Sequence, residues 1–101
     1  MALSGKLSWE ALLILTSLAD GAKHGYAIQQ DIERLSGRRL GPGSLYGAIA
    51  RLEAAGYIAP TQAEGPRRPY RLTAAGVRAL AAAVESVQKV TATAARRLAL
   101  G

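Results

Sequence analysis

The stretch "GPGSLYGAIARLEAAGYI", residues 41–58, decides how the rest of the chain is interpreted. Its larger apolar residues recur at helical spacing, which predicts a helix over residues 44–55 with one inward face. Those inward residues are Leu45, Ile49 and Leu52. Glycine, proline and glycine precede the helix, and Ser44 begins it. A helix start offers unpaired N–H groups, so small residues there suit either ordinary capping or the close approach of an anion.

The opposite face of this helix would be lined by small side chains and one arginine. If the apolar residues point inward, then Gly47, Ala50, Arg51 and Ala54 point outward and Tyr46 lies to one side. Such a face suits insertion into a major groove, with Arg51 reading a guanine or holding a phosphate and Ser44 donating to a phosphate or base edge. The alternative is a capped surface helix with Arg51 in solvent.

The flanking segments place this helix third in a series. Two helices are predicted before it. The first covers residues 7–19, with Ser8 as a potential N-cap, and the second covers residues 26–35 and ends before Gly37. Two short strands follow, at 57–61 and 70–73, joined by a polar turn. The link 37–43 is longer than the usual turn of about 3–4 residues. A short strand at "RRL", residues 38–40, that paired with the hairpin would account for the excess.

A last helix, capped by Thr73 and reaching about residue 98, shows an apolar seam at alternating spacings of three and four. The seam consists of Val77, Leu80, Val84, Val87, Thr91, Ala94 and Leu98. It predicts homodimerisation; folding back onto the chain's own core is the alternative. The order of elements is mainly α (α+β): a winged helix-turn-helix over residues 1–73 with a C-terminal dimerisation helix over 74–101.

Positive charge is concentrated around the predicted third helix and hairpin. The net charge is +6, and between residues 34 and 71 seven arginines face only two glutamates. A run this basic suggests a polyanionic partner, and a solvated basic surface with no partner is an equal alternative on charge alone. In the hairpin, Arg67 and Arg68 sit between two prolines and suit contacts with phosphates or a minor groove. Arg71 faces DNA or solvent with equal weight, and Tyr26 is a core residue or a phosphate contact.

Several function classes find no support. The chain has no cysteine and one histidine, His24, so no multi-histidine or thiolate metal site forms within it and no cofactor is expected. Neither a nucleophile motif nor a nucleotide-binding phosphate loop is present, so we do not expect an enzyme. His24 fits a helix-start role better than a general base. With no apolar run near the ~20 residues of a membrane span and no signal peptide, we expect a cytoplasmic protein without a membrane partner.

Three motifs in this order resemble the PadR-like family of transcriptional regulators, in particular its short members with a single C-terminal helix. They are "LILTSLADGAKHGYAIQQDI" (13–32), "LGPGSLYGAIARLEAAGYI" (40–58) and "RRPYRLTAAG" (67–76). The resemblance implies a winged-helix domain that binds double-stranded DNA as a homodimer, usually to repress neighbouring genes. It also implies relief by a small molecule, often an aromatic or cationic compound.

The chain departs from this family pattern in two places. Gly47 stands where the family often has proline, and it lowers helix propensity by about 1 kcal/mol relative to alanine. Some short members hold flat drugs between tryptophans of their final helices, but the only tryptophan here is Trp9 in the first helix. The sequence therefore does not support such a pocket between final helices. Trp9 is first of all a core or dimer-interface residue. The alternative is that Trp9, with Leu12 and Leu13, binds a small aromatic or apolar inducer.

The sequence thus predicts a homodimeric repressor that binds a palindromic operator. The competing hypothesis is a winged-helix module that binds an acidic protein partner. Such a module has no need of Arg51, Arg67 and Arg68 on one side.

Overall fold

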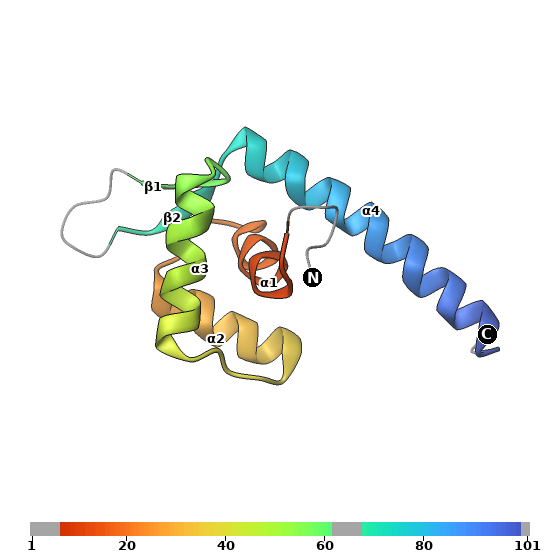
Figure 1. Cartoon of the computed structure of the whole chain (residues 1–101). Helices are drawn as coiled ribbons and strands as arrows, with labels where there is room; N and C mark the ends of the chain where they lie inside the picture. The colour runs from red at the N-terminus through yellow and green to blue at the C-terminus, as the bar shows by residue number, and fades with distance from the viewer. Residues whose placement is uncertain (1–6, 62–67, 100–101) are drawn as a thin grey trace.

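In the computed structural model, which describes residues 7–61 and 68–99, caps that the sequence supplies set one end of α1, of α2 and of α4. The Ser8 side chain accepts a hydrogen bond from the backbone N–H of Ala11 at 3.1 Å and begins α1, Trp9–Leu18. Gly37, in the left-handed region at φ 73°, ends α2, Gly25–Ser36. Next come α3, Pro42–Ala54, and the two strands β1, Ile58–Pro60, and β2, Tyr70–Leu72. The chain continues into α4, Ala74–Arg97, so the predicted mainly α fold with a small wing is confirmed (Figure 1).

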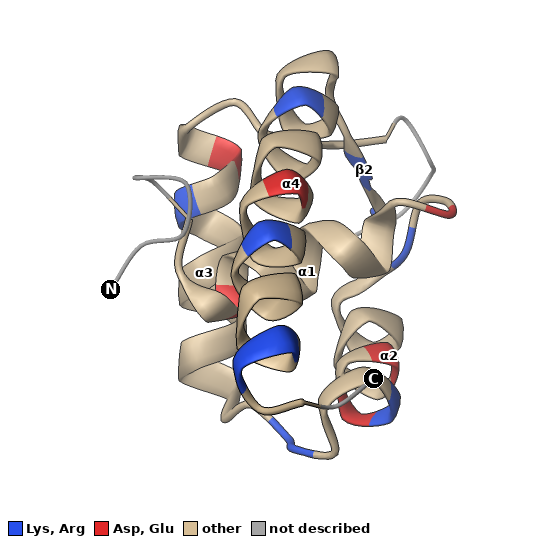
Figure 2. Cartoon of the chain, turned by 90° about the vertical axis from the view of Figure 1, so that its right-hand side faces the viewer, with Lys and Arg blue, Asp and Glu red and all other residues tan. Residues whose placement is uncertain are grey.

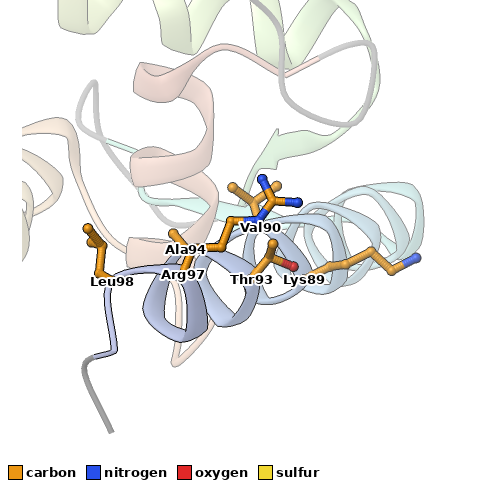
Figure 3. Close-up of a pocket in the computed structure, with 6 residues that line it drawn as sticks. All are labelled: Lys89, Val90, Thr93, Ala94, Arg97 and Leu98. Carbon is orange, nitrogen blue, oxygen red and sulfur yellow. The ribbon is translucent and has the colours of Figure 1, made fainter.

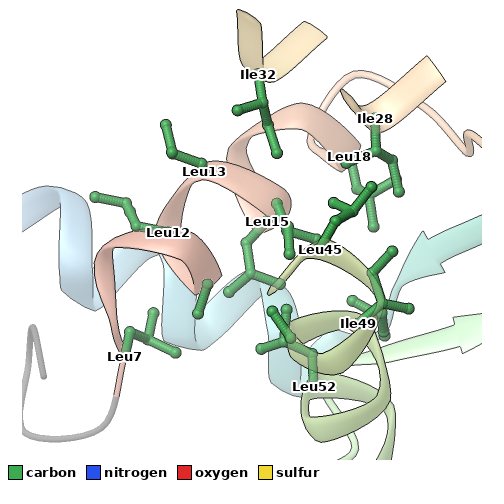
Figure 4. Close-up of a cluster of buried hydrophobic side chains, with 14 of the residues drawn as sticks. Leu7, Leu12, Leu13, Leu15, Leu18, Ile28, Ile32, Leu45, Ile49 and Leu52 are labelled. Atoms are coloured by element: carbon green, nitrogen blue, oxygen red, sulfur yellow. The ribbon is translucent and has the colours of Figure 1, made fainter. Parts of the chain in front are cut away.

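The core is built around α1, which is buried on nearly all sides and packs against α2, α3 and α4 (Figure 4). Ile14 and Leu15 have no exposed surface, and Ile28 and Ile32 of α2 are equally buried. Each such side chain contributes about 1.5–3 kcal/mol by leaving water. Because α1 is the shared support, α2 and α3 are held in a fixed relation to each other.

The two strands β1 and β2 form the wing, and the wing pairs with the loop between α1 and α2, not with residues 38–40. Ile58 pairs with Leu72 in the antiparallel β1–β2 ladder. On the other side of β2, Lys23 and Tyr70 exchange two backbone hydrogen bonds of 3.0 and 2.9 Å. The predicted strand at "RRL" is therefore wrong: these residues have no strand pairing, and the backbone of Leu40 is bonded by a side chain of α2 instead.

The side chain of Lys23 secures the same loop. Its ammonium group donates to the Asp20 carboxylate and to the backbone carbonyl of Ser17, at the end of α1. The hydrogen bond and charge of Lys23 hold the pKa of the exposed Asp20 carboxyl below its usual value. The loop that contains Lys23, which pairs with Tyr70 of β2, is thus hydrogen-bonded to the end of the core helix α1.

The last helix starts against the core and then leaves it. The Thr73 side chain accepts from the Gly76 N–H at 3.0 Å and donates to the Gly56 carbonyl at 2.6 Å, as expected of an N-cap. Ala83 is fully buried, and Leu80 and Val87 pack on the core. The remaining seam residues are exposed or only partly covered; these are Val77, Val84, Thr91, Ala94 and Leu98. The predicted seam is therefore divided between the chain's own core and a free surface, and the dimer itself stays a prediction.

Candidate nucleic-acid interface

The third helix has one buried and one exposed face, as its spacing predicted. Leu45, Ile49 and Leu52 are at most 5% exposed, whereas Arg51 and its small neighbours lie in solvent. Ala48 is also buried, which its small size did not reveal. The exposed residues of this face are Ser44, Tyr46, Ala50, Arg51 and Ala54, and Gly47 is half-buried.

The helix begins two residues earlier than the sequence suggested. Gly41 is the N-cap residue and Pro42 the first helical residue, with no side-chain capping bond. Proline fits there because its fixed φ is helical and its missing N–H is not needed. Ser44 as the start and cap of the helix is therefore wrong; it lies in the first turn with an exposed side chain. A Cβ added to Gly41 or Gly43 would meet no atom within 4 Å, so this turn is open to a ligand.

Gly47 and Arg51 form a unit one helical turn apart. A Cβ on Gly47 would lie 3.4 Å from Nη1 of Arg51, so the guanidinium extends back along the helix over the glycine. Across the described ranges 7–61 and 68–99, Arg51 has no carboxylate partner. Its five N–H donors are therefore available to an external acceptor.

Tyr46 makes a contact that sequence reasoning missed. A Cβ on Gly25 would lie 2.7 Å from Cε1 and 2.8 Å from the hydroxyl oxygen of Tyr46, so the ring lies directly against the start of α2. Tyr46 nevertheless stays 53% exposed. The only sign of this contact in the sequence was a glycine, Gly25, at the start of one helix and a tyrosine, Tyr46, near the start of the next. Tyr26, beside Gly25, is 68% exposed and accepts a hydrogen bond from Gln30 at 3.2 Å. A core role for Tyr26 is therefore wrong.

The wing presents Arg71 outward. Tyr70 and Leu72 are partly buried against the core, while the Arg71 side chain between them is exposed and donates to the Leu72 carbonyl at 3.3 Å. Arg68 is exposed, and Arg67 lies outside the described residues. Figure 1 shows α3 and the wing on one side of the molecule, away from the free end of α4.

Not all of the basic residues are available to a partner. Arg34 pairs with Asp31 and Arg39 pairs with Glu33, each at 3.1 Å. For Arg68 and Arg71, as for Arg51, the described part of the chain offers no carboxylate. The α4 side of the molecule also has basic positions along the helix, with an acidic one between them (Figure 2). The positive charge is therefore less confined to the α3 side than the sequence run suggested.

The three candidate ligand-binding residues do not form an open site within one chain. Trp9 is 55% exposed, but Leu12 and Leu13 are core residues of α1. A shallow hollow occurs instead along the last turns of α4, between Lys89 and Leu98 (Figure 3). Its lining combines apolar Val90 and Ala94 with the charged ends of Lys89 and Arg97.

No cluster of potential metal ligands occurs in residues 7–61 and 68–99. Three or more potential ligands of the His, Cys, Asp and Glu types do not gather anywhere in these ranges. His24 is the N-cap residue of α2 and makes no side-chain capping bond. Within the same ranges, no helix is both long and apolar enough to cross a membrane.

Comparison with known proteins gives this architecture a family. The family model for "Transcriptional regulator PadR-like family" matches residues 14–82, which run from α1 into α4. The chain belongs to the PadR-like family. Regulators of this family bind DNA and are generally not enzymes. The resemblance in the motifs of α2, α3 and the wing is thereby confirmed.

Two individual proteins are similar to this chain over part of its length. The chain is 43% identical over 72 residues to the transcriptional regulator Rv3488 of Mycobacterium tuberculosis, covering 68% of this chain and 66% of that protein. It is 58% identical over 65 residues to an uncharacterised 37.1 kDa protein in transposon TN4556 of Streptomyces fradiae, covering 64% of this chain and 19% of that protein. The chain thus spans about a fifth of one relative and about two thirds of the other.

Solved structures show the same fold. A transcriptional regulator from Clostridium thermocellum matches with a TM-score of 0.75 at 28% identity, over 87% of this chain and 88% of that one. A PadR family transcription regulator from Clostridium difficile R20291 matches with a TM-score of 0.69 at 25% identity, over 93% and 100% of the two chains. Both matches cover too much of this chain to end at the wing, so they include at least part of α4.

Proposed function

We propose that this PadR-like protein is a homodimeric, cytoplasmic repressor that reads a palindromic operator with α3. The observation that carries the proposal is the exposed face of that helix. Its first turn is open and has no side-chain cap, and its exposed side chains are mostly small. Arg51 on this face pairs with no carboxylate of the described residues. A helix with this face fits the floor of a major groove, which is wide enough to admit an α-helix.

Each exposed residue then has a distinct role. Arg51 reads a guanine edge or holds a phosphate, and Ser44 donates from the first turn. Gly47 leaves the room in which the Arg51 guanidinium lies. Tyr46, together with the neighbouring Tyr26 at the start of α2, contacts the DNA backbone. In the wing, Arg67, Arg68 and Arg71 contact phosphates or the minor groove beside the site of α3.

The dimer would form through the free surface of α4. Val77, Val84 and Leu98 are 54%, 42% and 67% exposed, which leaves an apolar strip that a second copy would cover. Two α3 helices related by a two-fold axis would then enter successive major grooves about 34 Å apart, which requires a palindromic operator. Val84→Asp should convert the dimer to a monomer in light scattering, whereas Glu85→Gln, on the next exposed position, should not.

An inducer would bind where two copies meet. Trp9, with Leu12 and Leu13 beneath it on α1, would provide the aromatic and apolar part of such a site, and the ligand would be a small aromatic or apolar compound. Because Trp9 is the only tryptophan, its fluorescence reports directly on binding. A compound that releases the protein from DNA without changing this fluorescence would place the inducer elsewhere.

The test of DNA recognition is fluorescence anisotropy with a duplex selected from random DNA by the wild-type protein, beside a scrambled duplex, across a range of salt concentrations. Arg51→Ala should lose about 1–3 kcal/mol of the preference between the two duplexes if it reads a base. A uniform loss with a salt slope reduced by about one would assign it to a phosphate. Arg78→Ala removes the same charge from an exposed position on α4 and should leave the preference unchanged.

Failure of the wild-type protein to bind any duplex at low salt would refute the proposal. In that case the basic side of α3 and the wing would favour the competing hypothesis, a module for an acidic protein surface.

A further inference from the structure

The link between α2 and α3 has no regular secondary structure, yet its polar groups are held by one stripe of α2. The stripe consists of Gln29, Glu33 and Ser36, which share a face because they are four and three residues apart. Each bonds a different residue of the link. Ser36 accepts from the Arg38 N–H at 3.2 Å, Glu33 accepts from Arg39 at 3.1 Å, and Gln29 reaches the backbone of Leu40.

Gln29 differs from the other two residues because it is buried and uses both ends of its amide. Its Oε1 accepts from the Leu40 N–H at 3.2 Å, and its Nε2 donates to the Leu40 carbonyl. The residue is 5% exposed, whereas Arg39 lies in solvent. An exposed ion pair such as Glu33–Arg39 contributes little. A buried amide with both partners in place costs much more to disrupt, because its partners are left unsatisfied.

The hydrogen bonds between Gln29 and Leu40 matter because of where Leu40 lies in the chain. Leu40 directly precedes Gly41, the N-cap residue of α3, and that cap has no side-chain hydrogen bond of its own. The core residues of α3 begin only at Leu45, one turn into the helix. The first turn, which carries Ser44 toward solvent, therefore takes its direction from the point at which the chain is held at Leu40.

We propose that Gln29 is the positioning residue of the DNA-reading helix. By holding both backbone groups of Leu40, it fixes where the first turn of α3 lies relative to α2, and so how Ser44 and the open N-terminus meet the DNA. The inference rests on the proposed function, because it needs α3 to read the operator. Gln29 itself touches no DNA and acts through the link.

The main variant is Gln29→Leu, which keeps nearly the same size and removes both hydrogen bonds. We expect its helical circular dichroism to match the wild type and its Leu40 amide to exchange hydrogen at least about tenfold faster, because opening no longer breaks a bond. Its preference for the selected duplex over the scrambled one should fall about tenfold, in the range of losing one good base contact. The salt dependence should be unchanged, because no phosphate contact is removed.

Gln30→Leu is the matched control. It makes the same change at the next residue, on the same helix, where the exposed amide reaches the Tyr26 hydroxyl. A changed contact between Tyr26 and the DNA backbone affects both duplexes alike, so it cancels in the ratio. Gln29→Glu is a milder variant that still accepts from the Leu40 N–H but does not donate to the carbonyl when ionised. It should show an intermediate loss of preference, and it replaces Gln29→Leu in the comparison if that variant does not fold.

The outcomes separate this inference from the function on which it rests. Loss of both Leu40 protection and duplex preference in the Gln29 variants, with Gln30→Leu unaffected, supports the inference. Loss of protection with an unchanged preference overturns it and leaves Gln29 a purely structural residue. A wild-type protein with no duplex preference overturns the proposed function first, and the positioning role with it.

Discussion

Replacing Gly76 with alanine should destabilise the protein, although alanine is the better helix former. A Cβ at this position would lie 2.0 Å from the carbonyl oxygen of Tyr57, and ordinary contact begins near 3.4 Å. The obstacle is backbone, so the start of α4 must withdraw by more than about 1 Å from Tyr57, which directly precedes β1. The withdrawal stretches the hydrogen bonds from Thr73 to the Tyr57 and Gly56 carbonyls, at 3.1 and 2.6 Å.

The magnitude follows from these contacts. Two hydrogen bonds contribute about 1 kcal/mol each, and a weakened N-cap about 1 kcal/mol more. Alanine returns about 1 kcal/mol through helix propensity. The free energy of unfolding should therefore fall by about 2 kcal/mol, which lowers the melting temperature by about 10 °C in a domain of this size.

Urea and thermal unfolding followed by circular dichroism measure this change, at one protein concentration because dimerisation shifts the midpoint. Gly47→Ala is the control: it is the same substitution within a helix, but its nearest neighbour is the flexible end of Arg51 at 3.4 Å. It should raise stability by up to about 1 kcal/mol. Equal stability of Gly76→Ala and wild type would refute the close approach of α4 to Tyr57.

Three further predictions concern other contacts. Gly25→Ala should push the Tyr46 ring away, because the new methyl would lie 2.7 Å from Cε1; anisotropy should show weaker operator binding with stability lowered by only about 1 kcal/mol, and unchanged binding would exclude Tyr46 from the interface. Ser17→Ala should leave the free energy of unfolding unchanged or raise it, because the buried hydroxyl has no hydrogen-bond partner in the described residues; a loss above about 1 kcal/mol in urea titration would contradict this. Since Lys23 lowers the pKa of Asp20, that carboxylate stabilises the fold above its unfolded-state pKa and ceases to do so as the pH falls through the lower folded-state pKa. Asp20→Asn should thus melt slightly below wild type at neutral pH, and the difference should close in acid as the wild-type carboxylate is protonated; a gap that widens in acid would count against the ion pair.

Local patterns in the sequence predicted the elements and most of their ends. The spacing of Leu45, Ile49 and Leu52 indicated the buried face of α3, and Ser8, Gly37 and Thr73 ended or began helices as expected. These features depend on residues within one or two turns of one another, which is the range over which periodicity and capping operate.

Contacts between distant residues could not be predicted in the same way. Leu40 takes its hydrogen bonds from Gln29, 11 residues away, and Tyr70 pairs with Lys23 in a loop that carries no strand signal. A strand at residues 38–40 was predicted because it would have accounted for the long link between α2 and α3; the link is held instead by the side chain of Gln29. The division of the α4 seam likewise depended on which face of the helix meets the core, which places Leu80 and Val87 against the core and leaves Val84 exposed.

The pairing of Lys23 with Tyr70 also bears on solubility at high concentration. A short projecting hairpin exposes two strand edges, and an open edge is a template for aggregation with other chains. Here the free edge of β2 is covered at Tyr70 by the loop between α1 and α2. The strand β1 is three residues long and ends at Pro60, which has no N–H to offer a new partner. Both edges are therefore blunted, and the wing can extend toward a ligand without recruiting copies of itself through strand addition.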